Sequence, residues 1–241
     1  MYGKLEEKPF VGSLKPNPPQ FFLRLAPRAL ALGGLLALFP LFLLCAVLIR
    51  LSSPGAVFFR QRRVGVGGTA FTLYKFRTMS AAAGLPVTAE NDLRITRFGR
   101  FLRKTKLDEL PELYNILRGD MAFVGPRPEV VELVDFENPL WREVLSVRPG
   151  ITDPVTLEFR NEENLLAGVE DKLKFYREVI QPYKLEGYAD YLKKKCLKND
   201  LKIVARTFMV VLFPRTAPPL KIKGMGAAEQ RTFDFALSEQ K

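Results

Sequence analysis

An uncharged stretch of 21 residues, ALALGGLLALFPLFLLCAVLI at positions 29–49, constrains the fold of this chain more than any other feature. About 20 consecutive apolar residues are enough for a helix to cross the hydrocarbon core of a membrane. Pro40 lies in the middle of the stretch, where it removes a backbone donor and clashes with the carbonyl of Leu36. The sequence therefore predicts a membrane helix over residues 29–50 that is broken at Pro40.

The charges on both sides of this stretch bear on its topology. Arginines precede and follow it, at Arg24, Arg28, Arg50, Arg60, Arg62 and Arg63. Positive residues favour the cytoplasmic side of a membrane, so both ends prefer the same side. A re-entrant helix that turns at Pro40 satisfies both preferences, and a conventional spanning helix remains the alternative. A secretory signal is disfavoured, because the apolar run starts late and arginines follow it.

The charge balance indicates the kind of partner. With 37 lysines and arginines against 26 acidic residues, the chain carries a formal charge of +11, which favours nucleic acid, anionic lipid or a phosphorylated substrate. Histidine is absent, so acid, base and metal-ligand roles fall first to carboxylates. Two dissimilar cysteines, Cys45 and Cys196, do not suggest a disulfide framework and favour a reducing compartment.

Two β-rich runs surround Gly65, Gly67 and Gly68 in GAVFFRQRRVGVGGTAFTLYKFRTM, a pattern that predicts a β-hairpin. Lys75 and Arg77 are two residues apart on the second run and so share one face. Together they offer a phosphate-binding pair of cations, although a charged, solvated edge strand explains the same pattern.

An adjacent pair of acids, Asp108 and Glu109, lies within TKLDELPELYNILRGD at positions 105–120. The apolar spacing after it predicts an amphipathic helix that ends near Gly119, and Pro111 is tolerated only in a first turn. Asp108 is therefore expected at or beside the helix N-terminus, where aspartate is a common N-cap. Six cations precede the pair, at Arg94, Arg97, Arg100, Arg103, Lys104 and Lys106. The second interpretation is an ionised carboxylate among arginines, next to backbone N–H groups that bind phosphate.

Further arginines follow in short rigid motifs. Arg127 lies between two prolines in VGPRP, Arg148 precedes Pro149 and Gly150, and EFRNEEN contains Arg160 and Asn161. A stiffly held guanidinium suits phosphate recognition, although prolines also flank arginine in inert turns. The chain lacks a Walker-type glycine loop, zinc-ligand spacing and a Ser/His arrangement, which excludes several common enzyme classes.

These motifs together resemble a known family. KFRTM, the segment from Arg94 through LDELPELYNILRGDM, VGPRP and RPGIT follow an apolar helix in the order typical of the bacterial sugar transferases, the monotopic polyprenol-phosphate phosphoglycosyl transferases. The resemblance extends from about Arg28 to Phe213. It implies transfer of a sugar-1-phosphate from a nucleotide-diphosphate sugar, such as a UDP-sugar, to polyprenyl (undecaprenyl) phosphate, with release of UMP at the start of glycan assembly.

The resemblance also implies roles for individual residues. Asp108 and Glu109 match the family's dyad, with the aspartate as nucleophile and Mg²⁺ as cofactor, and both carboxylates are candidate metal ligands. Glu109 ligates the metal or accepts a proton, and sequence does not separate these roles. Substrate and phosphate contacts are expected from Lys75, Arg77, Arg94, Arg103, Arg127, Arg160 and Asn161. Phe39 precedes Pro40 where the family often has serine, and Asp153 begins a segment that departs from its relatives, which leaves the sugar undefined.

The predicted fold is mixed α/β (α+β), with a re-entrant helix, a small antiparallel hairpin or sheet and several amphipathic interfacial helices. Residues 1–28 form an N-terminal segment, 29–50 the membrane helix, 51–213 the catalytic domain and 214–241 an irregular tail. Tyrosines and lysines mix over residues 176–195, which suits either a membrane interface or a solvated helix.

The expected location is the cytoplasmic face of the bacterial inner membrane, with anionic lipids as partners and no nucleic acid. Homo-oligomer formation is left open. A different class of function remains, a non-catalytic membrane-anchored scaffold in which Asp108 only caps a helix.

Overall fold

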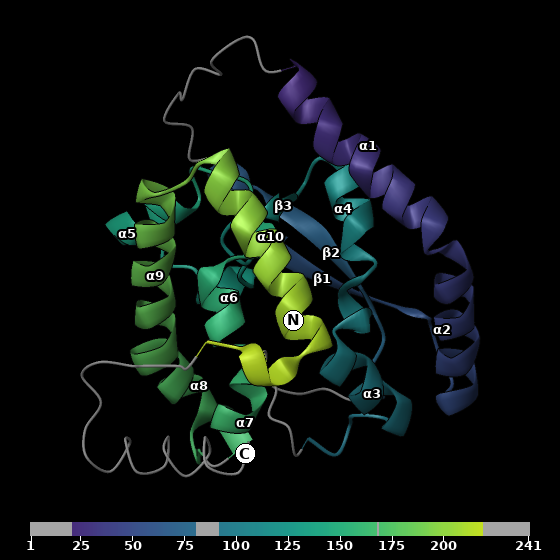
Figure 1. The fold of residues 1–241 in the computed structure, drawn as a ribbon. Helices are drawn as coiled ribbons and strands as arrows, with labels where there is room; N and C mark the ends of the chain where they lie inside the picture. Colours follow the sequence, from purple (N-terminus) through teal and green to yellow (C-terminus); the bar gives the residue numbers. More distant parts are fainter. Residues whose placement is uncertain (1–20, 81–91, 168, 219–241) are drawn as a thin grey trace.

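The computed structural model describes residues 21–80, 92–167 and 169–218. Two helices, α1 (Phe21–Ala37) and α2 (Phe39–Ser52), lie along one side of the molecule, and α9 (Gln181–Lys193) lies on the opposite side. Helix α10 (Leu197–Leu212) crosses the space between them, in front of the strands (Figure 1). The expectations for residues 1–20 and for most of the tail lie outside the described residues.

The apolar stretch forms two helices that meet at an angle of 61°. The break is at Leu38, and Pro40 occupies the first turn of α2, where its missing N–H costs no helical hydrogen bond. The predicted break is confirmed, but α1 already includes Phe21, eight residues before the apolar run starts at residue 29. Among the described helices none is long and apolar enough to cross a membrane alone, whereas the bent pair meets that test by length and composition.

Each half of the bent pair packs on the rest of the protein along one face. Ala31 of α1 is buried against Ile116, while Cys45 and Ile49 of α2 are buried with Phe76. The other face carries exposed large side chains, namely Leu32, Leu36, Phe39, Leu43, Leu44, Val47 and Leu51. An apolar surface of this size is unfavourable in water and suits contact with lipid. Packing on the domain therefore holds the bend, although Phe39 has no hydroxyl to bond the backbone there.

We expect both ends of the bent pair to face the cytoplasm. The test is labelling of single cysteines at positions 15 and 61 in intact cells, after Cys45 and Cys196 have been changed to serine. Neither position should react with a membrane-impermeant thiol reagent until the cells are opened. Pro40→Ala should straighten the break and expose one of the two labels to the outside. Periplasmic labelling of either site in the protein that keeps Pro40 would contradict a re-entrant topology.

The predicted hairpin is confirmed. Strands β1 (Phe58–Val64) and β2 (Ala70–Phe76) pair antiparallel, with Phe58 opposite Phe76 and Val64 opposite Ala70. A 3₁₀ turn, η1 (Val66–Gly68), joins them, and Gly67 and Gly68 both adopt positive φ, of 68° and 78°. Only residues without a side chain adopt this conformation readily, which explains the glycine cluster.

A second, parallel pair of strands was not predicted. Strand β3 (Ala122–Val124) pairs with β4 (Gly150–Thr152), which places the VGPRP and RPGIT motifs side by side. The two backbones approach so closely that a Cβ on Gly150 would lie 2.2 Å from the nitrogen of Gly125. The pairing therefore requires glycine and fixes the start of the Arg127 loop.

The remaining elements are short and surround these strands. In chain order they are α3 (Arg97–Thr105), η2 (Leu107–Glu109), α4 (Glu112–Arg118), η3 (Val131–Leu133), α5 (Pro139–Val144), α6 (Pro154–Glu158), α7 (Glu162–Ala167), α8 (Lys172–Phe175), the π-helix η4 (Tyr176–Ile180) and η5 (Pro214–Thr216). The fold is mixed α/β, as the sequence predicts, and mostly helical.

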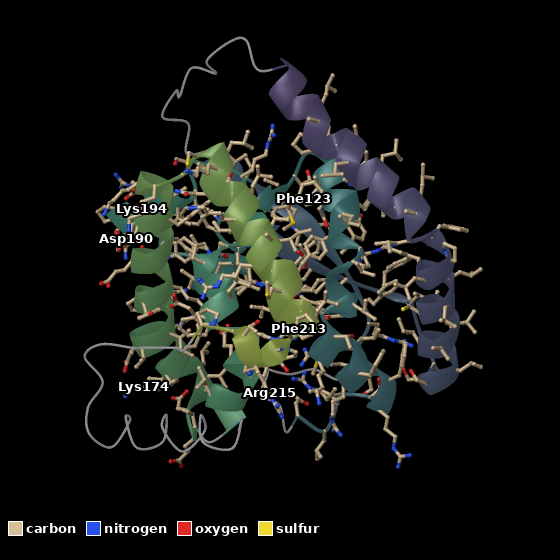
Figure 2. All side chains as sticks on the ribbon, in the orientation of Figure 1. Phe123, Lys174, Asp190, Lys194, Phe213 and Arg215 are labelled. Atoms are coloured by element: carbon tan, nitrogen blue, oxygen red, sulfur yellow. The ribbon has the colours of Figure 1, made fainter. Side chains whose placement is uncertain are left out.

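Three of the four tyrosines between residues 176 and 195 are core residues. Tyr176, Tyr188 and Tyr191 are buried, so the interfacial interpretation is wrong for these three side chains. Figure 2 shows Asp190 of α9 and Lys194, the residue after the helix, pointing outward, and both are exposed, as expected of a solvated face. The exposed apolar stripe lies instead on α10, at Leu197, Leu201, Phe208 and Leu212, while Val210 on another face is buried.

Candidate active site

Asp108 lies in a tight turn between two helices. Helix α3 ends at Thr105, and the left-handed conformation of the next residue, Lys106 (φ 59°), turns the chain into η2. Neither η2 nor α4 has a side chain that caps its N-terminus, so the interpretation of Asp108 as a helix cap is wrong. The side chain is buried, and among the described residues its Oδ1 atom has no hydrogen-bond partner. A buried carboxylate oxygen without a partner is costly, and such costs are often retained where an atom has a chemical role.

Glu109, next in the chain, is held by two cations. Its Oε1 lies 2.5 Å from Nη2 of Arg127 and 3.1 Å from Nζ of Lys75. Nη1 of Arg127 also donates to the carbonyl of Ile151 at 3.3 Å, which anchors the guanidinium to β4. Burial alone would raise the pKa of Glu109, but Arg127 and Lys75 hold it well below its usual range. Glu109 is therefore ionised at neutral pH.

The electrostatic environment of Asp108 differs from that of its neighbour. Burial raises the pKa of Asp108, and the charge of Glu109 adds to this effect, while Lys75, Lys106 and Arg103 act against it. Among the described residues Asp108 has no ion-pair partner, whereas Glu109 has two. The expectation that arginines ring Asp108 is thus wrong in detail: the close arginine pairs with Glu109, and Asp108 keeps an uncommitted oxygen.

A third acid, Glu112, lies behind the pair and was missed from the sequence. Its Oε1 is 3.4 Å from Nζ of Lys75 and 3.9 Å from Nη2 of Arg127, so it shares both cations with Glu109. The side chain is 1% exposed. The spacing in the sequence could have indicated this residue, because residues three and four apart on a helix lie on one face and Glu112 is three residues after Glu109.

The other predicted binding residues divide into two groups. Arg103 donates to Oε2 of Glu163 at 2.9 Å and to Thr78 at 3.1 Å, and Arg160 donates to the carbonyl of Lys104 at 3.1 Å. Arg94 pairs with Asp92, and this hydrogen-bonded contact lowers the pKa of Asp92 to about 2. These three arginines lie around the same cavity as Asp108.

Arg77 and Asn161 are placed differently. The guanidinium of Arg77 donates to the carbonyls of Ser53 and Pro54, both at 2.7 Å, just after α2 ends. It therefore ties the broken helix to β2, although Arg77 also lines the same cavity. Lys75 is the cation of the pair that reaches the acids. Asn161 is exposed and is not among the residues that line the cavity.

The cavity has a volume of about 2210 Å³ and two kinds of wall. Its polar wall includes Lys75, Arg103, Asp108, Glu109, Arg127 and Arg160. Its apolar wall comes from α1, α2 and α10, through Leu30, Leu38, Leu41, Leu201, Val204 and Phe208. Such a space suits a ligand with a charged head and an apolar tail.

The side chains around Asp108 indicate how the expected Mg²⁺ could be bound. Among the described residues no group of three or more carboxylate, cysteine or histidine side chains converges on a metal position. Mg²⁺ commonly takes only one or two carboxylates and completes its shell with water and substrate phosphates. The carboxylate of Asp108 fits that use, whereas both oxygens of Glu109 face cations.

Sequence comparison finds similar proteins whose names describe the transfer of a sugar phosphate to undecaprenyl phosphate. The chain is 38% identical over 200 residues to the UDP-glucose:undecaprenyl-phosphate glucose-1-phosphate transferase of Xanthomonas campestris pv. campestris, covering 80% of this chain and 39% of that protein. It is 39% identical over 180 residues to a protein of the same description from Caulobacter vibrioides, covering 72% of this chain and 63% of that one. It is 44% identical over 149 residues to the UDP-N-acetylgalactosamine-undecaprenyl-phosphate N-acetylgalactosaminephosphotransferase of Aeromonas hydrophila, covering 59% and 35%.

The chain thus spans less than two thirds of the length of these relatives. The family match itself covers residues 19–214, which include the bent helix pair, both sheets and the acids around Asp108. The chain belongs to the bacterial sugar transferase family.

Proposed function

We propose that this protein transfers a sugar-1-phosphate from a UDP-sugar to undecaprenyl phosphate, through a covalent intermediate on Asp108. The observation that carries the proposal is the contrast between two adjacent carboxylates. Glu109 is neutralised by Lys75 and Arg127, whereas Oδ1 of Asp108 is buried, uncommitted and beside a cavity with one apolar wall. The family and the descriptions of the similar proteins support the same substrates.

In the first step, Oδ1 of Asp108 attacks the phosphorus that bears the sugar. The P–O bond to the uridine monophosphate part breaks, UMP leaves, and an acyl phosphate forms on Asp108. Lys75, Arg103, Arg127 and Arg160 surround the space that a diphosphate would enter, and their charges oppose the repulsion between carboxylate and phosphate.

In the second step, a phosphate oxygen of undecaprenyl phosphate attacks the same phosphorus. The acyl phosphate bond breaks, Asp108 is restored as a carboxylate, and the product is undecaprenyl diphosphosugar. The apolar wall formed by α1, α2 and α10 suits the isoprenoid chain of the acceptor. Dividing one transfer into two steps lets the soluble donor and the lipid acceptor use one site in turn.

Asp108 is the residue that would hold Mg²⁺, and the ion would supply positive charge that offsets the charge of the phosphates. Glu109 is the less suitable ligand of the two, because its oxygens already face Lys75 and Arg127. Its low pKa also makes it a weak proton acceptor. We assign to Glu109 the task of holding the two cations at the front of the site.

The membrane location follows from the substrates and the bent helix pair. A polyprenyl acceptor resides in a bilayer, and nucleotide sugars are cytoplasmic, so we propose the cytoplasmic face of the bacterial inner membrane. The exposed apolar faces of α1 and α2 would insert there, and the net charge of +11 favours anionic headgroups.

Release of UMP from a panel of UDP-sugars, with undecaprenyl phosphate and Mg²⁺ present, tests the proposal. We expect one sugar to give sustained release that requires the lipid, and UDP-glucose and UDP-N-acetylgalactosamine are the first to try. A membrane-anchored scaffold would release no UMP from any member of the panel while still binding vesicles. That result would refute the enzymatic assignment.

A further inference from the structure

Glu112 has no place in the steps above, yet it is among the most buried charged groups of the described residues. It does not line the cavity, whereas Glu109 does. Lys75 and Arg127 therefore lie between a front carboxylate, Glu109, that faces the substrate space and a rear carboxylate, Glu112, that does not.

The rear carboxylate is poorly satisfied by hydrogen bonds. Neither Oε1 nor Oε2 of Glu112 has a hydrogen-bond partner among the described residues, and its contacts to the two cations are longer than those of Glu109. The charged groups that act on it are Lys75 on β2, Arg63 on β1, Arg127 after β3, and Asp108 and Glu109 on η2. A carboxylate held this loosely in a dry place gains little from its charge.

The charges of this cluster balance only while the site is empty. Lys75 and Arg127 carry two positive charges, and the ionised forms of Glu109 and Glu112 carry two negative charges. A diphosphate beside the cations adds negative charge to the same small volume. The buried carboxylate is the group that most readily removes one such charge, because protonation costs it no hydrogen bond.

We propose that Glu112 is a positioning residue that takes up a proton when the diphosphate of the nucleotide sugar reaches Lys75 and Arg127. The proton comes from solvent and returns to it when the nucleotide leaves. Protonation releases the rear hold on the two cations, so that their charge acts on phosphate, while the buried carboxyl still occupies its place behind them. This inference rests on the proposed function, since it needs a diphosphate at this site.

The electrostatics of the empty site agree with this role. Burial raises the pKa of Glu112 to about 7, with Glu109 and Asp108 adding to the effect and Lys75 and Arg127 opposing it. At pH 7.5 to 8 the group is therefore mostly ionised before a diphosphate arrives. Further negative charge nearby raises its pKa again, which means net proton uptake on binding.

Calorimetric titration of the full chain in detergent measures that proton. The Asp108→Asn background blocks turnover and removes one further acid with a raised pKa, and Asp153 and Glu163, whose pKa values are also raised, stay the same in both proteins. UDP-glucose and UDP-N-acetylgalactosamine are titrated at pH 7.8 in buffers of different ionisation enthalpy, and these diphosphates do not themselves titrate near that pH. We expect uptake of a large fraction of one proton in Asp108→Asn and close to none in the double variant with Glu112→Gln. Equal uptake in both proteins would overturn the proposal.

A second measurement needs no nucleotide and so separates failure of this inference from failure of the proposed function. A carboxyl whose pKa is raised on folding destabilises the protein as pH rises from its unfolded value, near 4.5, through its folded value. The melting temperature of Glu112→Gln should therefore exceed that of the parent by several degrees more at pH 8.5 than at pH 5. Glu137→Gln, on an exposed side chain, should show no such change. A gap that does not widen with pH means that Glu112 does not titrate in this range, which also overturns the proposal.

Discussion

Asp108→Asn is expected to lose about 10⁴-fold or more of the transfer rate, the scale seen when covalent machinery is removed. Asparagine has nearly the same size as aspartate but does not form an acyl phosphate with a nucleotide sugar. The fold should survive, because among the described residues Asp108 has no ion pair and caps no helix. Release of UMP and formation of the lipid-linked sugar are both measured against the unmodified chain.

The control for this loss is thermal unfolding of the same preparation. Since Asp108 is buried with a raised pKa, its neutral replacement should leave the melting temperature unchanged or higher at neutral pH. Glu109→Gln is a useful comparison, because it leaves the nucleophile in place but frees Lys75 and Arg127 from their front partner. Normal turnover by Asp108→Asn would rule out the nucleophilic role.

Arg127→Lys is expected to reduce turnover by about 10- to 100-fold, even though it keeps the charge. The guanidinium contacts Glu109 with both terminal nitrogens and also donates to the carbonyl of Ile151. A lysine ammonium cannot satisfy this planar arrangement, and a hydrogen bond to a charged group contributes about 1.5–3 kcal/mol. The rate of UMP release at saturating donor and the melting temperature are measured together.

The matched control is Arg142→Lys, since Arg142 is half exposed on α5 and its ion pair with Glu137 is open to solvent. We expect no change in turnover there, because exposed pairs contribute little. Lys75→Ala and Arg160→Ala should also lose turnover, with a smaller loss at Arg160, which does not reach the acids. If activity and melting temperature fall in proportion for Arg127→Lys, Lys75→Ala and Arg160→Ala, these residues are structural and the assigned phosphate site is wrong.

Local features were predictable because neighbouring residues decide them. The break near Pro40 follows from the missing backbone donor, and the hairpin turn follows from Gly67 and Gly68 at positive φ. The end of α4 at Gly119 follows from a C-terminal glycine with φ 89°. In each case the backbone geometry is set by the proline or glycine itself, so the local sequence is enough to predict it.

The missed features depend on contacts between distant segments. Strand β3 pairs with β4 across 28 positions, between residues 122 and 150, and three-residue strands leave no alternation to detect. Arg77 shares a face with Lys75 and lines the same cavity, but its guanidinium donates to the carbonyls at the end of α2, a contact that the strand pattern does not predict. A periodic pattern gives the face of a strand and not what packs against it.

Tertiary packing also determines which acidic residues have cation partners and which tyrosines are buried. Asp108 and Glu109 are adjacent, and the sequence alone does not distinguish them. In the tertiary structure Glu109 pairs with two cations, whereas Oδ1 of Asp108 has no hydrogen bond. Tyr176 and Tyr188 look amphipathic beside lysines, but the helices around them close over both rings. Sequence spacing does not contain that information.

The most direct test of the central claim is mass spectrometry of the enzyme after incubation with a nucleotide sugar and Mg²⁺ but without a lipid acceptor. We expect a sugar-phosphate adduct on the peptide that contains Asp108, its loss when undecaprenyl phosphate is added, and its absence in Asp108→Asn. Lipid-dependent transfer with no adduct on that peptide under rapid acid quench, or an adduct that persists in Asp108→Asn, would contradict it.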